Sequence, residues 1–294
     1  MLTARGHKLI GGADLRWALV FSPRLWCIAV ERSGLVLDTR FVPAAVEDAR
    51  GTTCLYVLLS GSFAIHGEPG LCFEAPSAFV LSDEHLEGAR GARPFTFTAA
   101  GRPFAAIQLH FRAADLTVPP AALPVQVALD EPAWEAARAV ARFAGEDDAF
   151  RHDVSALVER IASLGLVVPA AGTRDGPSRA FAVLWRALRP MIERLYLTPT
   201  LQEVGDATGI SVRQTDRIIQ DFVASFAQVG QGWRPATRHL RLKLATMLLS
   251  AESATVADVA SAVGYRSSDA MARAFRDAGM PPPTVVKEQI RAAG

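Results

Sequence analysis

The chain has 294 residues, of which 50% are hydrophobic and 21% charged, and its formal net charge is +1. This length is enough for two domains with separate cores. The longest apolar runs are far shorter than the roughly 20 residues that span a bilayer, and no apolar signal-peptide segment follows the charges of the N-terminus. We therefore expect a protein without membrane spans, located in the cytoplasm.

The charges divide unevenly along the chain. Residues 178–294 hold 15 Lys+Arg against 10 Asp+Glu, whereas residues 1–177 hold 16 against 20. A basic C-terminal half can supply the phosphate contacts that dominate affinity for nucleic acid, and an acidic N-terminal half is less suited to touch it.

The first half of the chain has the pattern of short strands separated by Gly, Pro or charged turns. Apolar residues alternate with polar ones in 95–98 and 107–111, which places them on one face of each strand. The expected strands are 17–21, 25–30, 35–40, 54–59, 62–66, 78–81, 95–98 and 105–111. Repeated short antiparallel strands close economically into a barrel or jelly roll.

Two helices are expected after these strands, over 134–143 and 154–166, because apolar residues recur there at helical spacing. The apolar residues in question are Trp134, Val140, Leu157 and Ile161. They either cover the barrel of their own chain or pair with a second protomer, and both interpretations stay open.

Residues 169–177 combine Pro, Gly and polar residues and form the best linker in the chain. The expected domains are therefore 1–168 and 179–294, joined by 169–178. A fragment that starts near Ser178 is expected to fold alone.

The three cysteines, Cys27, Cys54 and Cys72, are widely spaced and flanked by apolar residues. An odd number with this spacing favours reduced, buried thiols over a disulfide framework or a zinc site.

The histidines of the first half are the candidates for a metal site. His66 and Glu68 stand two residues apart, and His85 and His110 follow on later strands or turns, so three imidazoles could converge. The His-x-His pair with a following Glu is absent, and we find no nucleophile elbow, phosphate loop or Cys/His pairing. We expect no metal, no other cofactor, no catalytic residues and no enzyme activity, with a metal-dependent barrel enzyme bearing a helical appendage as an alternative.

The most informative pattern occurs twice near the C-terminus, its second copy 55 residues after the first. One copy runs from Thr200 to Gly209 and the other from Thr255 to Gly264. Each opens on a threonine N-cap with an acidic residue three positions later, as a capping box requires, and each ends on a glycine, where a positive φ costs little. A short turn and a second helix follow. This is the outline of a helix-turn-helix, whose second helix enters the DNA major groove.

The stretch between the copies and the end of the second copy identify a family. Leu240 to Leu249 resembles the long connecting helix of the AraC/XylS transcriptional regulators, and Val263-Gly264-Tyr265 with Met271 to Arg276 resembles the signature of that family. The resemblance covers about residues 185 to 290. It implies an α+β multidomain protein with an N-terminal cupin-like β-barrel and flanking helices, followed by an all-α domain with two helix-turn-helix motifs.

The resemblance also implies the residues that contact DNA. The first recognition helix should run from about 211 to 222, with Ile218 and Phe222 packed inward, and in the second Met271 and Phe275 should be core. The expected base-reading residues are Arg213, Gln214, Arg217, Ser267, Ser268, Asp269 and Arg273. The expected phosphate contacts are Thr200, Thr255, Arg266 and Arg276. A rigid connector would hold the two helices about 34 Å apart, one turn of DNA.

The barrel is expected to bind a small organic effector without metal. The residues that could line its pocket are Trp17, Phe95, Phe97, Gln108 and His110. The partners implied are double-stranded DNA, the effector, a second protomer in a homodimer, and RNA polymerase, with no membrane. Two alternatives stay open: a filled barrel used only for dimerisation, and a protein-interaction module whose degenerate second motif no longer binds DNA.

Overall fold

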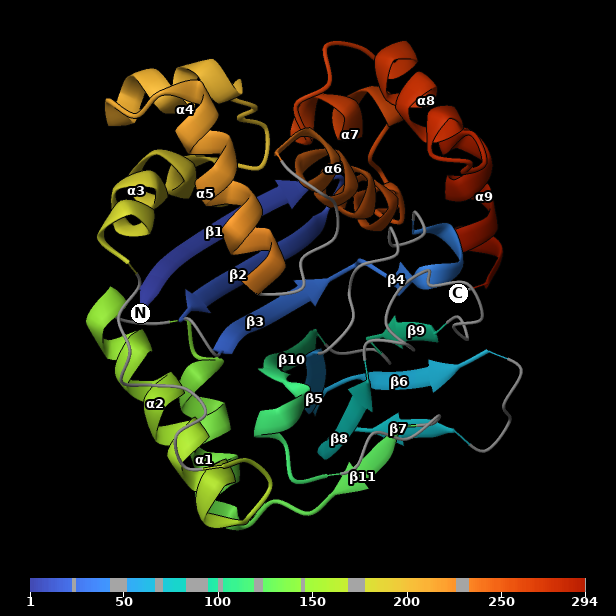
Figure 1. Cartoon of the computed structure of the whole chain (residues 1–294). Helices are drawn as coiled ribbons and strands as arrows, with labels where there is room; N and C mark the ends of the chain where they lie inside the picture. Colours follow the sequence, from blue (N-terminus) through green and yellow to red (C-terminus); the bar gives the residue numbers. More distant parts are fainter. Residues whose placement is uncertain are drawn as a thin grey trace.

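The computed structural model describes residues 1–22, 25–42, 52–66, 71–82, 95–99, 103–118, 124–143, 146–168, 178–225 and 233–293. They form an α+β fold in which two antiparallel sheets are followed by helices (Figure 1). No helix within these ranges combines the length and the apolar character that crossing a membrane requires.

The larger sheet has seven strands in the order β1-β2-β3-β10-β5-β8-β11, and the smaller has four in the order β4-β9-β6-β7. The strands of the larger sheet are β1 (Leu2–Ile10), β2 (Ala13–Phe21), β3 (Leu25–Ser33), β5 (Thr52–Ser60), β8 (Ser77–Ser82), β10 (Phe104–Arg112) and β11 (Val125–Val127). Those of the smaller sheet are β4 (Leu37–Asp38), β6 (Ser62–Ile65), β7 (Cys72–Glu74) and β9 (Phe95–Thr98).

The two sheets do not close into the barrel expected from the sequence. Closure needs hydrogen bonds between the edge strands, but along the described strands β1 and β11 stay at the edges of the larger sheet. The strand expected over 35–40 is also wrong, because only β4 pairs there, with β9. The Asp38 carboxylate accepts a hydrogen bond from the Arg40 amide and starts a short 3-10 turn, Thr39–Phe41, instead.

Aromatic rings fill the space between the sheets. Phe63 of the smaller sheet lies 4.6 Å, centroid to centroid, from Phe79 of the larger one. Phe95 and Phe97 lie 5.2 and 5.0 Å from the same Phe63 ring. These separations are those of packed aromatic pairs, so the rings stabilise the stacking of the two sheets.

The outer face of the larger sheet is covered by α1 (Glu131–Val140) and α2 (Asp147–Ser163). Val140, Leu157 and Ile161 are fully buried in one cluster with sheet residues, and Trp134 packs on its margin. Of the two interpretations kept open for these helices, the structure supports the first: their apolar faces cover the sheet of their own chain.

The C-terminal helices cover the part of the inner face that the smaller sheet leaves free, over β1 and β2 (Figure 1). They are α3 (Arg179–Glu193), α4 (Leu201–Thr208), α5 (Val212–Ser225), α6 (Trp233–Leu249), α7 (Val256–Ala262), α8 (Ser268–Asp277) and α9 (Pro283–Ala293). Ala4 and Phe21 of the sheet share a core with Trp185 of α3 and Ile219 of α5. Leu15 of β2 belongs to the same cluster as Leu248 of α6.

Residues on both sides of the expected linker therefore share hydrophobic cores. Residues 169–177 themselves lie outside the described residues. The boundary between 1–168 and 179–294, and the independent folding of the second part, stay predictions.

The cysteines differ in burial. Cys27 and Cys54 are buried thiols, as expected, whereas Cys72 is exposed. The expectation for Cys72 is wrong because, among the described strands, β7 is an edge strand that pairs only with β6.

Candidate DNA-binding surface

The first repeat forms a capped helix followed by a tight turn, as its pattern predicts. The Thr200 hydroxyl accepts a hydrogen bond from the Glu203 amide at 3.2 Å, and the Glu203 carboxylate accepts one from the Thr200 amide at 2.6 Å. Hydrogen bonds from the Thr200 amide and hydroxyl lower the pKa of the Glu203 carboxyl. Gly209 ends α4 with φ +67°. The capping box is thus complete.

The turn brings α4 and α5 into close contact at Gly205. A Cβ atom at Gly205 would lie 2.9 Å from the Ile210 carbonyl oxygen and 3.6 Å from the Thr215 hydroxyl. Thr215 is fully buried, and its hydroxyl has no hydrogen-bond partner. Thr215 and Ile219 therefore form the inward face of α5, which turns Arg213, Gln214 and Arg217 outward.

All three residues expected to read bases in this unit are exposed. Arg213 and Gln214 lie in the first turn of α5, where the Ser211 hydroxyl accepts a hydrogen bond from the Gln214 amide. Arg217 follows one turn later. Of the expected inward residues, Ile218 is half-buried and packs on the core that contains Trp185, and the side chain of Phe222 lies outside the described residues.

The second repeat has the same capping chemistry. The Thr255 hydroxyl accepts a hydrogen bond from the Asp258 amide at 3.1 Å, and the Asp258 carboxylate accepts one from the Thr255 amide at 2.8 Å. Hydrogen bonds from the Thr255 hydroxyl and amide lower the pKa of Asp258. Gly264 follows the helix with φ +78°. Thr200 and Thr255 both stay exposed, but their hydroxyls already serve as caps.

In α8, Met271 and Phe275 are fully buried, as expected. Asp269 and Arg273 are exposed, and Ser268 is half-buried. The exposed Ser267 is the N-cap of this helix, since its hydroxyl accepts a hydrogen bond from the Ala270 amide at 3.1 Å. Of the residues expected to meet phosphates in this unit, Arg266 precedes α8 and Arg276 lies in its last turn, and both are exposed.

Two arginines of the connecting helix α6 bond to the second unit. The sequence analysis did not identify these two arginines. Arg241 Nε donates to the Val263 carbonyl oxygen at 2.7 Å, and its guanidinium lies 3.8 Å from the centre of the Tyr265 ring. Arg238 donates to the Ala274 carbonyl oxygen at 3.2 Å. The only available signal was their spacing of three, which places both on one face of a helix.

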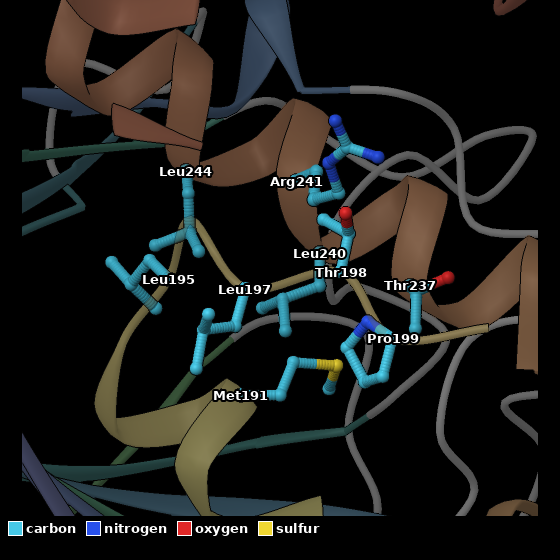
Figure 2. A pocket seen from close by; sticks show the side chains of 9 residues that line it. All are labelled: Met191, Leu195, Leu197, Thr198, Pro199, Thr237, Leu240, Arg241 and Leu244. Carbon is cyan, nitrogen blue, oxygen red and sulfur yellow. The ribbon is translucent and has the colours of Figure 1, made fainter. Parts of the chain in front are cut away.

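The turn of the second unit touches the segment that leads into the first unit. A Cβ atom at Gly264 would lie 2.5 Å from the Tyr196 carbonyl oxygen, so the turn of the second unit packs on the segment that connects α3 to α4. Next to this contact is a small apolar hollow in which leucines of that segment face leucines of α6 (Figure 2). Its lining consists of Met191, Leu195, Leu197, Thr198, Pro199, Thr237, Leu240, Arg241 and Leu244.

Of the five residues expected to line an effector pocket, Trp17, Phe95 and Phe97 belong to one buried hydrophobic cluster. Phe95 and Phe97 belong to the packed rings between the sheets. Trp17 lies under α3, where its Nε1 donates to the Ile192 carbonyl oxygen. Gln108 is half-buried on β10 between Tyr56 and Ile28 of the neighbouring strands.

His110 is buried in a stack rather than in a pocket. Its ring lies 3.8 Å from the Trp26 ring, and Nε2 lies 3.5 Å from the Cys54 sulfur. Burial, with the charge of Lys243 as a second cause, lowers the pKa of His110 to about 3. His110 is therefore a neutral side chain at physiological pH.

The histidines considered for a metal site have separate partners. His66 Nε2 lies 2.5 Å from the Thr96 hydroxyl and 3.4 Å from the Asp38 carboxylate, whereas His110 stacks on Trp26. Glu68 and His85 lie outside the described residues. Within the described part of the chain, no three His, Cys, Asp or Glu residues form a group that could hold a metal ion.

The geometry thus defines a two-sheet domain whose inner face carries a pair of capped helix-turn-helix units. No family model and no curated protein matches the chain. Among solved structures, ToxT from Vibrio cholerae bound to an unsaturated fatty acid is similar over 90% of this chain and 95% of that chain, at 10% identity and a TM-score of 0.38.

Two further solved structures are similar at comparable levels. The AraC-like transcriptional activator CuxR is similar over 96% of this chain and 81% of that chain, at 12% identity and a TM-score of 0.22. An oxalate decarboxylase, OxdC from Bacillus subtilis, is similar over 58% of this chain and 38% of that chain, at 11% identity and a TM-score of 0.24. These TM-scores give no basis for transferring the activity of those proteins to this chain.

Proposed function

We propose that the protein is a sequence-specific, double-stranded DNA-binding transcriptional regulator whose DNA affinity responds to a small-molecule effector. α5 and α8 are the recognition helices, and each enters one of two successive major-groove segments. Arg213, Gln214 and Arg217 read bases in the first segment, and Asp269 and Arg273 in the second. A homodimer would read two such pairs of segments.

The observation that supports this function best is the repeated local structure. Two helices follow reciprocal capping boxes at Thr200 and Thr255, and the helix after each turn has a buried side and an outward arginine, Arg217 or Arg273. A helix packed on its own core on one side and basic on the other suits the major groove, where arginine pairs bidentately with guanine.

The effector part of the proposal is supported by how the two halves meet. The DNA-binding helices share cores with the sheets, so a ligand that changes this contact changes the arrangement of α5 and α8. Coupling between ligand and DNA is then reciprocal, typically about 1 to 3 kcal/mol.

The test starts from sites that the full chain selects out of a random duplex library, followed by affinity measurements on a selected and a scrambled duplex. Arg217→Ala and Arg273→Ala should each weaken binding to the selected site by about 1 to 3 kcal/mol and leave binding to the scrambled duplex nearly intact. We expect the Arg217 change to have the larger effect.

Arg160→Ala is the matched control, because Arg160 is an exposed arginine of α2 on the opposite face of the sheet. It should leave both affinities unchanged. Specific binding must also weaken steeply as salt rises, because phosphate contacts release counterions. If both arginine variants prefer the selected duplex over the scrambled one as strongly as the wild type does, or if binding does not depend on salt concentration, a protein-interaction module is favoured instead.

A further inference from the structure

Arg241 of α6 contacts the turn of the second helix-turn-helix unit in two ways. Its Nε donates to the Val263 carbonyl oxygen at 2.7 Å, and its guanidinium lies 3.8 Å from the centre of the Tyr265 ring. Val263 is the C-cap of α7, so its carbonyl is one of those that a helix end leaves without an intrahelical donor. Arg241 supplies that donor and lies over the ring two residues later, within the range of cation–π attraction.

The same side chain also reaches the segment that leads into the first unit. Arg241 lines the hollow of Figure 2 together with Thr198 and Pro199, and Pro199 precedes Thr200, the N-cap of α4. A Cβ atom at Gly264, in the turn that Arg241 contacts, would lie 2.7 Å from Thr198 Cγ2. Arg241 therefore lies where α6, the entry to the first unit and the turn of the second unit meet.

The hollow itself is lined mostly by apolar side chains. Leu195 and Leu197 face Leu240 and Leu244 of α6 across it (Figure 2). Burial of apolar surface has no preferred direction, so it holds the elements together without fixing how they are rotated. A hydrogen bond does fix this, because it weakens steeply as its angle changes. The bond from Arg241 therefore gives the contact between α6 and the second unit a direction.

A second bond from α6 reaches the recognition helix itself. Arg238, one turn before Arg241, donates to the Ala274 carbonyl oxygen in the last turn of α8 at 3.2 Å. Two points along a helix define its direction, so α8 is held relative to α6 both at the turn before it and near its end. Arg238 is exposed and Arg241 is half-buried. The bond from Arg241 is the stronger of the two, because water competes less for a buried donor.

We propose that Arg241 is the positioning residue that sets the spacing of α5 and α8, and thereby the number of base pairs between the two groove segments of the DNA site. B-DNA advances about 3.4 Å and turns by about 35° per base pair, so a recognition helix that is displaced by one base pair meets the groove at the wrong angle. The inference rests on the proposed DNA-binding function and adds the residue that determines the spacing of the site.

The test compares the duplex that the full chain selects with two derivatives, in which one base pair is inserted or deleted between the two segments. The base positions affected by Arg217→Ala and by Arg273→Ala define these segments. The wild type should bind each derivative about tenfold more weakly than the selected duplex, because only one recognition helix then keeps its base contacts.

Arg241→Met should lower this preference about fivefold or more, because α8 can then shift to meet either derivative. Arg241→Lys keeps a charge beside the Tyr265 ring and loses the paired donors of the guanidinium, so its preference should lie between those of the wild type and Arg241→Met. Circular dichroism and Tm show whether each variant is folded. If Arg241→Met does not fold, Arg241→Lys alone carries the test.

Arg234→Met is the matched control, since Arg234 is an exposed arginine of the same helix. It removes the same charge, so any loss of phosphate attraction should weaken binding to the three duplexes by the same factor. Its preference for the selected spacing should equal that of the wild type.

A folded Arg241 variant that keeps the wild-type spacing preference, or that loses affinity for all three duplexes by the same factor, would overturn the assignment and make Arg241 a residue of stability alone. Equal binding of the three duplexes by the wild type would also overturn it, but would leave the regulator function standing. A wild type that selects no duplex would instead contradict the regulator function itself.

Discussion

The indole nitrogen of Trp17 donates a hydrogen bond to the carbonyl oxygen of Ile192 at 3.1 Å, which ties β2 to the C-terminal end of α3. A second tryptophan forms the reciprocal bond, because Trp185 Nε1 of α3 donates to the Thr3 carbonyl oxygen of β1 at 3.3 Å. The Trp17 ring lies over Gly6, its register partner, where a Cβ would stand 1.9 Å from the ring. The larger sheet and α3 are therefore joined by two indole donors and a glycine that makes room for one of them.

Trp17→Phe should lower the free energy of unfolding by about 1 to 2 kcal/mol, because it leaves the Ile192 carbonyl without its donor and removes part of a packed ring. Urea unfolding of the full chain measures this change. Trp134→Phe makes the same chemical change on α1, away from this contact, and should cost less. Equal losses in the two variants would show that the bond to Ile192 contributes nothing.

Thr215→Val should raise the free energy of unfolding by about 1 kcal/mol, because it replaces a fully buried hydroxyl that has no partner with a methyl group of similar size. Thr246→Val is the opposite case. Thr246 is equally buried, but its hydroxyl donates to the Phe41 and Leu242 carbonyl oxygens, so this variant should lose about 1 kcal/mol. Chemical denaturation of both variants should give changes of opposite sign, and a loss in both would contradict the prediction for Thr215.

Gly264→Ala should destabilise the chain more than Gly279→Ala. Both glycines have positive φ, +78° and +72°, where an L-residue costs about 1 to 2 kcal/mol. A Cβ at Gly279 meets nothing within 4 Å, whereas one at Gly264 meets the Tyr196 carbonyl oxygen at 2.5 Å. The difference between the two melting temperatures therefore measures the contact between Gly264 and the segment that joins α3 to α4. Equal Tm values in the two variants would mean that the structure accommodates a methyl group beside the Tyr196 carbonyl without loss of stability.

Acid should destabilise the protein through His110. Its pKa falls from 6.5 to about 3 on folding. Between about pH 3 and pH 6.5 the imidazole is therefore protonated in the unfolded chain and neutral in the folded chain. The stabilisation is fully present above pH 6.5 and is lost as pH falls towards 3, by at most about 5 kcal/mol. His110→Phe keeps a ring beside Trp26 and should flatten the dependence of unfolding free energy on pH in this window. The surface variant His152→Phe should follow the wild type, and an unchanged slope in His110→Phe would contradict the assignment.

The local structure of both helix-turn-helix units could be predicted from the sequence. Thr200, Thr255 and the glycines that follow them act within a few residues, since a cap bonds to its own first turn and a positive φ is a property of one residue. The same holds for the buried Met271 and Phe275, which helical periodicity identifies. Alternation likewise predicted β9 and β10.

Contacts between distant segments decided the rest. The middle of β1 consists of Arg5, Gly6, His7 and Lys8, and this sequence has no pattern typical of a strand. The segment forms a strand because it pairs with β2 beneath α3. The surroundings of the expected effector residues depend on distant segments too: Phe97 of the smaller sheet packs against Tyr56 of the larger one, and Trp17 bonds to α3. Arg32 resembles any surface arginine in the sequence. Phe97 of β9, Phe104 of β10 and Met247 of α6 together make it a buried charge, because desolvation depends on every segment that excludes water and not on the residues beside it in the chain.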